Sequence, residues 1–191
     1  MEYIVEKIGM SRTITVPSKP VTLLRVLDTK VCEVSEGTAI VAYNSGKKMN
    51  KSIEGQQKKY SLSAEFNRFV TLEVANTESG DLDMNPLAEA SVLRSTFNTK
   101  GRGFSGAMKR WNFSGGPASH GHRFGRRTGS IGMAEWPGRV MKGKKMPGQY
   151  GNTQNSVKNE IVSYDAENKI IAVMGSVSGA NGALGRVKVA K

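Results

Sequence analysis

The sequence predicts a mainly β protein: a small β-barrel body with a long, irregular basic extension inserted before the C-terminal hairpin. Short runs rich in Val, Ile, Thr and Phe recur toward both ends of the chain, separated by Gly, Pro, Ser or Asn. Between them, residues 97–155 contain few aliphatic side chains and most of the net charge, so they cannot form a hydrophobic core of their own. Strand after strand on either side of such a segment favours one barrel made from both ends of the chain.

The first part of the body is expected to consist of strands with one weakly periodic helix. The strands are the apolar or alternating runs at residues 2–8, 21–27, 30–34, 39–43, 69–74 and 92–97. The helix is predicted over residues 52–66, where Ile53, Tyr60, Leu62 and Phe66 recur at imperfect helical spacing.

The last part of the body is expected to close the barrel. Residues 157–164 and 169–174 are β-rich runs joined by the turn sequence at 165–168, which predicts a hairpin, and residues 184–190 predict a final strand. We therefore assign residues 1–96 and 156–191 to the β-barrel body and residues 97–155 to the extension.

Composition excludes several classes of protein. The chain has 191 residues and a formal net charge of +12, which favours a polyanionic partner such as nucleic acid. Cys32 is the only cysteine and His120 and His122 are the only histidines, so we expect no disulfide, no metal site and no cofactor. Glu2 and Glu6 argue against a signal peptide, and the longest uncharged stretch is too short to span a membrane. A cytoplasmic location is expected.

The positive charge is concentrated in the extension. Residues 97–155 contain eleven basic residues and one acid, Glu135, which gives +10, whereas the rest of the chain contributes only +2. The same segment holds 13 of the 22 glycines and both tryptophans. A segment of this length inside a compact domain is either functional or disordered until it binds a partner.

Enzymatic motifs in the extension lack their required context. Residues 101–106 fit the G-x-G-x-x-G pattern, but no full amphipathic helix and no appropriately spaced acid follow, so a dinucleotide site is rejected. His120 and His122 have no carboxylate but Glu135 to orient them, and no nucleophile motif is present. The sequence therefore predicts that the protein is not an enzyme and has no small-molecule substrate.

Interleaved basic and aromatic residues instead predict RNA binding. Lysine and arginine neutralise phosphates, while aromatic rings stack on unpaired bases. The candidate stacking residues are Trp111, His120 and Trp136. The candidate phosphate-binding residues are Lys100, Arg102, Lys109, Arg110, Arg123, Arg126, Arg127, Arg139, Lys142, Lys144 and Lys145.

The extension resembles large-subunit ribosomal protein three of bacterial type. Six motifs carry the resemblance in order and spacing, at residues 100–106, 109–113, 119–121, 129–132, 137–140 and 143–151. The resemblance implies a barrel on the ribosome surface and an extension that penetrates large-subunit (23S) ribosomal RNA toward the peptidyl transferase centre. It also implies a role in early subunit assembly, and neighbouring ribosomal proteins as partners.

Two points remain open at the level of sequence. In some bacterial members of this family the glutamine matching Gln149 is N-methylated, which would make a glutamine methyltransferase a further partner; the alternative is an unmodified amide that contacts RNA. A free RNA-binding module or an RNA-modification factor are the alternative functions, although a single carboxylate in the extension argues against the second.

Overall fold

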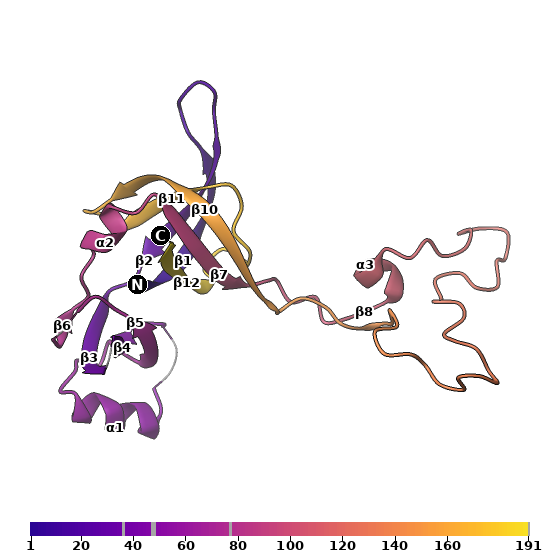
Figure 1. The fold of residues 1–191 in the computed structure, drawn as a ribbon, viewed down its shortest axis with the longest axis horizontal. Coiled ribbons are helices and arrows are strands. Elements are labelled where there is room, and N and C mark those ends of the chain that lie inside the picture. Colours follow the sequence, from indigo (N-terminus) through magenta and orange to yellow (C-terminus); the bar gives the residue numbers. More distant parts are fainter. Residues whose placement is uncertain (36, 47–48, 77, 191) are drawn as a thin grey trace. The chain divides into compact units, whose positions relative to one another are not determined.

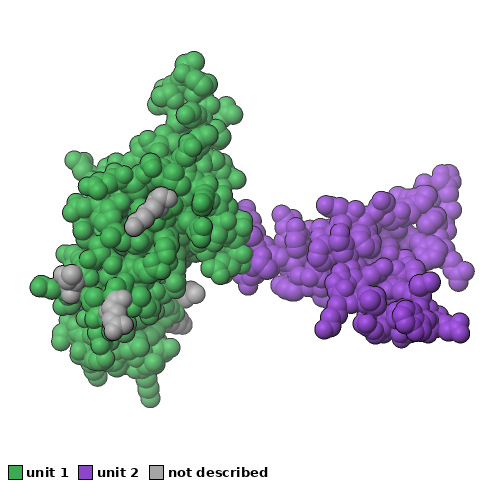
Figure 2. Space-filling view, in the orientation of Figure 1, with its two compact units in different colours: residues 1–98, 154–191 green, residues 99–153 purple. Residues whose placement is uncertain are grey.

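The computed structural model describes residues 1–35, 37–46, 49–76 and 78–190, and it divides the chain into two compact units (Figures 1 and 2). The first unit, the body, comprises Met1–Asn98 and Gln154–Lys191. The second unit, which we call the arm, is Thr99–Thr153.

The body is built around a closed barrel of six antiparallel strands, which confirms the predicted fold class (Figure 1). Residues from both ends of the chain close it, because β12 lies between β1 and β7. In order around the barrel the strands are β1 (Glu2–Arg12), β12 (Leu184–Ala190), β7 (Val92–Asn98), β10 (Gln154–Asp165), β11 (Ile170–Met174) and β2 (Pro20–Val26).

Branched aliphatic side chains from most of its strands fill the barrel. Val5, Leu24, Leu93, Ile171 and Val187 come from five different strands, and each is fully buried. Along β7 buried and more exposed residues alternate, as expected for a strand with one face inward. In β1 and β11 three consecutive residues are buried, so both faces of these strands are covered there. The body therefore has its own hydrophobic core.

The barrel does not include every strand of the body. β3 (Thr29–Ser35), β4 (Thr38–Tyr43), β5 (Arg68–Glu73) and β6 (Gly80–Asp81) form a separate four-stranded sheet in the order β5-β4-β3-β6. The reason is that β2 already pairs with β1 on one side and β11 on the other, so the barrel has no free edge for β3 to join.

The predicted helix over residues 52–66 is shorter in the structure. α1 (Lys51–Lys59) starts after Asn50, whose side chain accepts a hydrogen bond from the Ile53 N–H. It ends because Ser61 has a left-handed φ of 51° and the buried Gln57 amide donates to the Phe66 carbonyl at 2.7 Å. A further short helix that the sequence did not predict, α2 (Asn85–Ala88), buries Leu87.

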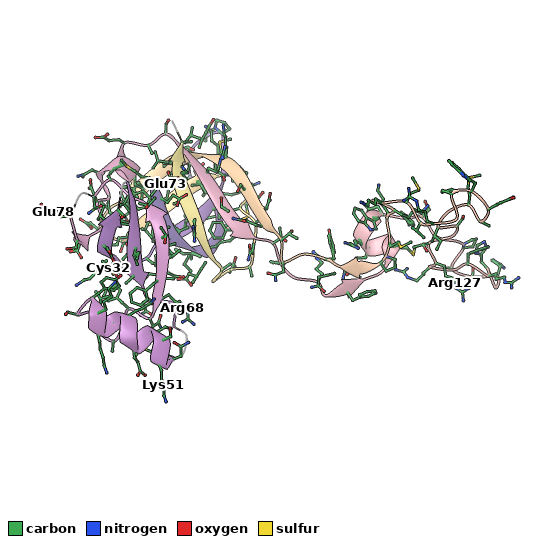
Figure 3. The ribbon with its side chains drawn as sticks, turned by 60° about the horizontal axis from the view of Figure 1, so that its bottom comes forward. Cys32, Lys51, Arg68, Glu73, Glu78 and Arg127 are labelled. Atoms are coloured by element: carbon green, nitrogen blue, oxygen red, sulfur yellow. The ribbon has the colours of Figure 1, made fainter. Side chains whose placement is uncertain are left out.

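The two sheets of the body share one core and polar links. Val31, Val41 and Leu72 of the second sheet belong to the same buried cluster as the barrel residues. The Lys188 ammonium on β12 contacts both oxygens of the Glu73 carboxylate on β5 at 2.6 Å, and this contact lowers the pKa of Glu73. Figure 3 labels Glu73 on its strand.

Tyr3 forms a second polar contact within the body and makes the stability of the body depend on pH. Its side chain is 1% exposed, and its hydroxyl donates to the Asp83 carbonyl at 3.0 Å. Burial, followed by the Asp83 carboxylate and Tyr164, raises the pKa of Tyr3 to about 12. Folding therefore favours the neutral phenol, whereas the unfolded chain ionises near pH 10.

We expect this contribution to stability to be complete below pH 10 and to be lost as the pH rises toward 12. By pH 12 the loss should reach about 2 kcal/mol in the free energy of unfolding, because half of the Tyr3 side chains in the folded protein are still neutral at that pH. Urea unfolding between pH 8 and pH 12 measures it. The Tyr3→Phe variant should lack this part of the decline, and Tyr150→Phe, which changes a tyrosine of the other unit, should retain it. Equal pH profiles for the parent and Tyr3→Phe would contradict the assignment.

Candidate nucleic-acid interface

The arm is highly charged and has almost no interior. It contains eleven basic residues and one acid, a net charge of +10, whereas the body has 17 basic and 15 acidic residues. Of its 55 residues, all of which the structure describes, only Ser105 and Ala107 are buried. Figure 2 shows this unit in purple. A segment of this kind needs an external partner to compensate its charge and cover its surface.

A short ribbon forms the root of the arm. β8 (Phe104–Ser105) pairs with β9 (Gly148–Gln149), and the Arg102 N–H donates to the Tyr150 carbonyl at 2.8 Å. Gly151 has a φ of +75°, and a Cβ at that position would lie 2.0 Å from the Lys100 carbonyl oxygen. Only glycine at position 151 allows these two segments of the backbone to approach this closely.

Arg110 and Trp111 are part of the internal support of the arm. Both lie in or beside the last turn of α3 (Ala107–Trp111), and both side chains donate to the Met146 carbonyl at 2.9 Å. The Arg110 guanidinium lies 5.0 Å from the Trp111 ring centre, and Lys145 lies 5.7 Å from the same ring. These contacts brace the chain immediately before β9, and the Trp111 ring is still 38% exposed.

The other predicted phosphate-binding residues are all exposed. None of them makes an ion pair or a side-chain hydrogen bond with any residue in the described part of the chain, except that Lys145 contacts the Trp111 ring. Their positive charge is therefore not compensated within the protein. They are Lys100, Arg102, Lys109, Arg123, Arg126, Arg127, Arg139, Lys142, Lys144 and Lys145.

The structure exposes more aromatic surface than the sequence singled out. Of the predicted stacking residues, Trp136 is 85% exposed and His120 is exposed in a left-handed conformation with a φ of 65°. Phe104 and Phe124 are also exposed, at 80% and 57%, and were not selected from the sequence. The sequence does indicate that these two rings are exposed, because neither phenylalanine has aliphatic neighbours along the chain with which to form a core.

Comparison with known proteins decides the family. A family model described as ribosomal protein L3 matches residues 88–176, which include the whole arm. The large ribosomal subunit protein uL3 of Campylobacter jejuni is 69% identical over 191 residues, covering 100% of both chains. The chain belongs to the ribosomal protein L3 family.

Relatives from other bacteria extend the same result. The uL3 protein of Wolinella succinogenes is 69% identical over 192 residues, with all of both chains covered. That of Thermosipho melanesiensis is 41% identical over 201 residues, covering 97% of this chain and 96% of the relative. The resemblance inferred from six motifs in the extension is thus confirmed over the full length of this ribosomal protein L3 family member.

Other classes of site have no support in the described residues. Within residues 1–35, 37–46, 49–76 and 78–190, no group of His, Cys, Asp or Glu is arranged to hold a metal ion. No helix in the same ranges has the length and apolar character needed to cross a membrane.

Proposed function

We propose that the protein is a structural constituent of the large ribosomal subunit whose arm binds large-subunit ribosomal RNA. One observation carries the proposal: a unit of net charge +10 buries only two of its residues and presents ten exposed cations that form no ion pair with the described residues. RNA supplies both missing elements, since its phosphates compensate the lysines and arginines and its bases cover the exposed rings. Family membership assigns a structural role in the ribosome rather than an enzymatic one.

The family resemblance supports a more specific version of this function. The arm would penetrate 23S ribosomal RNA toward the peptidyl transferase centre and buttress the RNA there. The body, with a nearly balanced charge of +2, would remain at the surface beside neighbouring ribosomal proteins. Binding many phosphates with one chain would also bring distant RNA segments together, which suits a role early in subunit assembly.

Co-sedimentation tests the proposal directly. In a cell extract separated on a sucrose gradient, we expect the protein to sediment with large subunits and with their precursors, and not at the position of the free protein. Recovery mainly as free protein, or with RNAs other than the large-subunit RNA, would instead support a free RNA-binding module or an RNA-modification factor.

We expect the arm to be disordered in the RNA-free protein. Ordering the backbone costs roughly 1–2 kcal/mol per residue, and burial of Ser105 and Ala107 alone cannot offset this cost over 55 residues. Hydrogen exchange followed by mass spectrometry should show rapid exchange throughout residues 99–153, with the paired strands β7 and β10 protected. If the arm of the RNA-free protein were protected as strongly as these strands, the expectation would be contradicted.

Gln149 is proposed as a site of N-methylation by a glutamine methyltransferase before assembly. Its side chain is exposed on β9, and its amide makes no hydrogen bond with the described residues. Methylation would remove one amide N–H donor and add an apolar group. In protein from assembled subunits, the peptide containing Gln149 should be heavier by one methylene, as measured by mass spectrometry. An unshifted mass would assign the amide to RNA contact in its unmodified form.

A further inference from the structure

We propose that residues 112–129 of the arm form a pocket for a single unstacked nucleobase of the large-subunit RNA. The structure contains a hollow of about 500 Å³ in this part of the arm. The residues of its lining that carry the argument are Asn112, Gly115, Gly116, His122, Phe124 and Arg127. The inference rests on the proposed function and adds to it a defined contact with one base.

Two glycines allow the hollow to exist. Gly115 has a φ of +70°, and a Cβ there would lie 2.9 Å from the Gly125 carbonyl oxygen. A Cβ on Gly116 would lie 2.0 Å from the His122 ring nitrogen Nδ1. The Gly116 N–H donates to the Gly125 carbonyl at 2.8 Å and joins the two sides of the loop. The backbone itself therefore forms this wall of the hollow, and the His122 ring lies close against it at Gly116.

Two aromatic rings provide a surface for stacking. The rings of His122 and Phe124 are 6.2 Å apart between centres and tilted by 47°. Phe124 is 57% exposed, although a phenylalanine gains most when it is covered by apolar or aromatic surface. A planar base stacked on this ring would bury it, and stacking on aromatic side chains is a common way in which proteins bind unpaired RNA bases.

Unpaired polar groups line the same hollow. Among the described residues, the Asn112 amide, the His122 imidazole and the Arg127 guanidinium have no hydrogen-bond partner. Figure 3 labels Arg127 on the arm. An amide and an imidazole both donate and accept, which suits the mixed edge of a base, whereas a guanidinium suits a phosphate. The hollow thus combines the groups that a nucleotide requires.

The surroundings favour a base within RNA over a free mononucleotide. Arg123 and Arg126 flank the hollow along the chain, and both are exposed without a carboxylate partner in the described part of the protein. A polynucleotide offers phosphates on both sides of the bound base to these cations, and a free nucleotide does not.

Chemical probing of the RNA tests the proposal. The full-length protein is bound to a large-subunit RNA transcript, and the bases are probed with dimethyl sulfate, kethoxal and a carbodiimide. One base should be protected by the parent protein and reactive with Phe124→Ala. The affinity for the RNA should fall about 5- to 150-fold in this variant, as expected for loss of one stacked base. Gly116→Ala should expose the same base, because its new methyl group displaces His122.

Phe104→Ala is the matched control, since Phe104 is an exposed phenylalanine of the same arm, on β8, and does not line the hollow. With this variant the same base should stay protected. Identical base reactivity for the parent, Phe124→Ala and Gly116→Ala would overturn the pocket, while phosphate protection by the arm would leave the proposed function standing. Absence of both kinds of protection would refute the proposed function as well. Saturable binding of AMP or GMP at micromolar concentration would assign the hollow to free nucleotides and also overturn the proposal.

Discussion

Raising the salt concentration from about 50 to about 200 mM should weaken the binding of the protein to large-subunit RNA by about 10³- to 10⁵-fold. Each phosphate that a lysine or arginine neutralises releases a condensed counterion, so the affinity falls steeply as salt is added. The arm presents ten exposed cations that form no ion pair with the described residues, enough for the six to ten phosphate contacts that a loss of this size requires. Arg110 is excluded from this number because it donates to the Met146 carbonyl.

The salt dependence is measured by filter binding of the full-length protein to the RNA transcript at several salt concentrations. Replacing Lys142 and Lys144 with glutamine should lower the slope of log affinity against log salt by about 1.4 to 1.8, the contribution of two phosphates. The matched control replaces Lys51 and Lys58 of α1 with glutamine, which changes the net charge equally but lies in the body. A flat affinity, or equal slopes for the two double variants, would show that the arm does not bind phosphates.

The fold was predictable wherever it depends on local patterning. Each barrel strand coincides with a β-rich run of the sequence, because a strand that packs against a core needs apolar and β-branched residues along its own length. The separation of β3, β4 and β5 into a second sheet was not predictable in this way. Which strands become neighbours depends on whether both edges of β2 are already paired, and this is a property of the assembled sheet.

The candidate site shows the same division between composition and geometry. The charge of the arm and its lack of aliphatic residues are readable from the sequence, because they depend only on which residues are present. The structural role of Arg110 and Trp111 is not readable in this way. Both side chains donate to the Met146 carbonyl, which lies 36 and 35 residues further along the chain, respectively. The proposed role of His122 and Phe124 likewise depends on the fold, which brings His122 beside Gly116 and the Phe124 ring beside His122.

Phe97→Ala is expected to destabilise the body by about 3–5 kcal/mol, the usual cost of removing a buried aromatic ring. Phe97 is 2% exposed on β7 and lies opposite Gly185 of β12. A Cβ on Gly185 would lie 2.5 Å from the Phe97 ring, so the ring covers the space that a side chain would occupy. The next residue, Asn98, pairs with Gln154 at the point where the chain leaves the barrel for the arm.

A double-mutant cycle separates this packing from a general loss of stability. Gly185→Ala should destabilise the parent protein, because its methyl group must displace the Phe97 ring, but it should have little or even a favourable effect beside Phe97→Ala, where the space is empty. Urea unfolding of the four proteins measures the coupling, and Phe104→Ala, which removes an exposed ring, serves as the control with little expected change. If Gly185→Ala costs the same free energy in both backgrounds, the two positions are not coupled. The strand pair at the exit to the arm must then be held by other contacts.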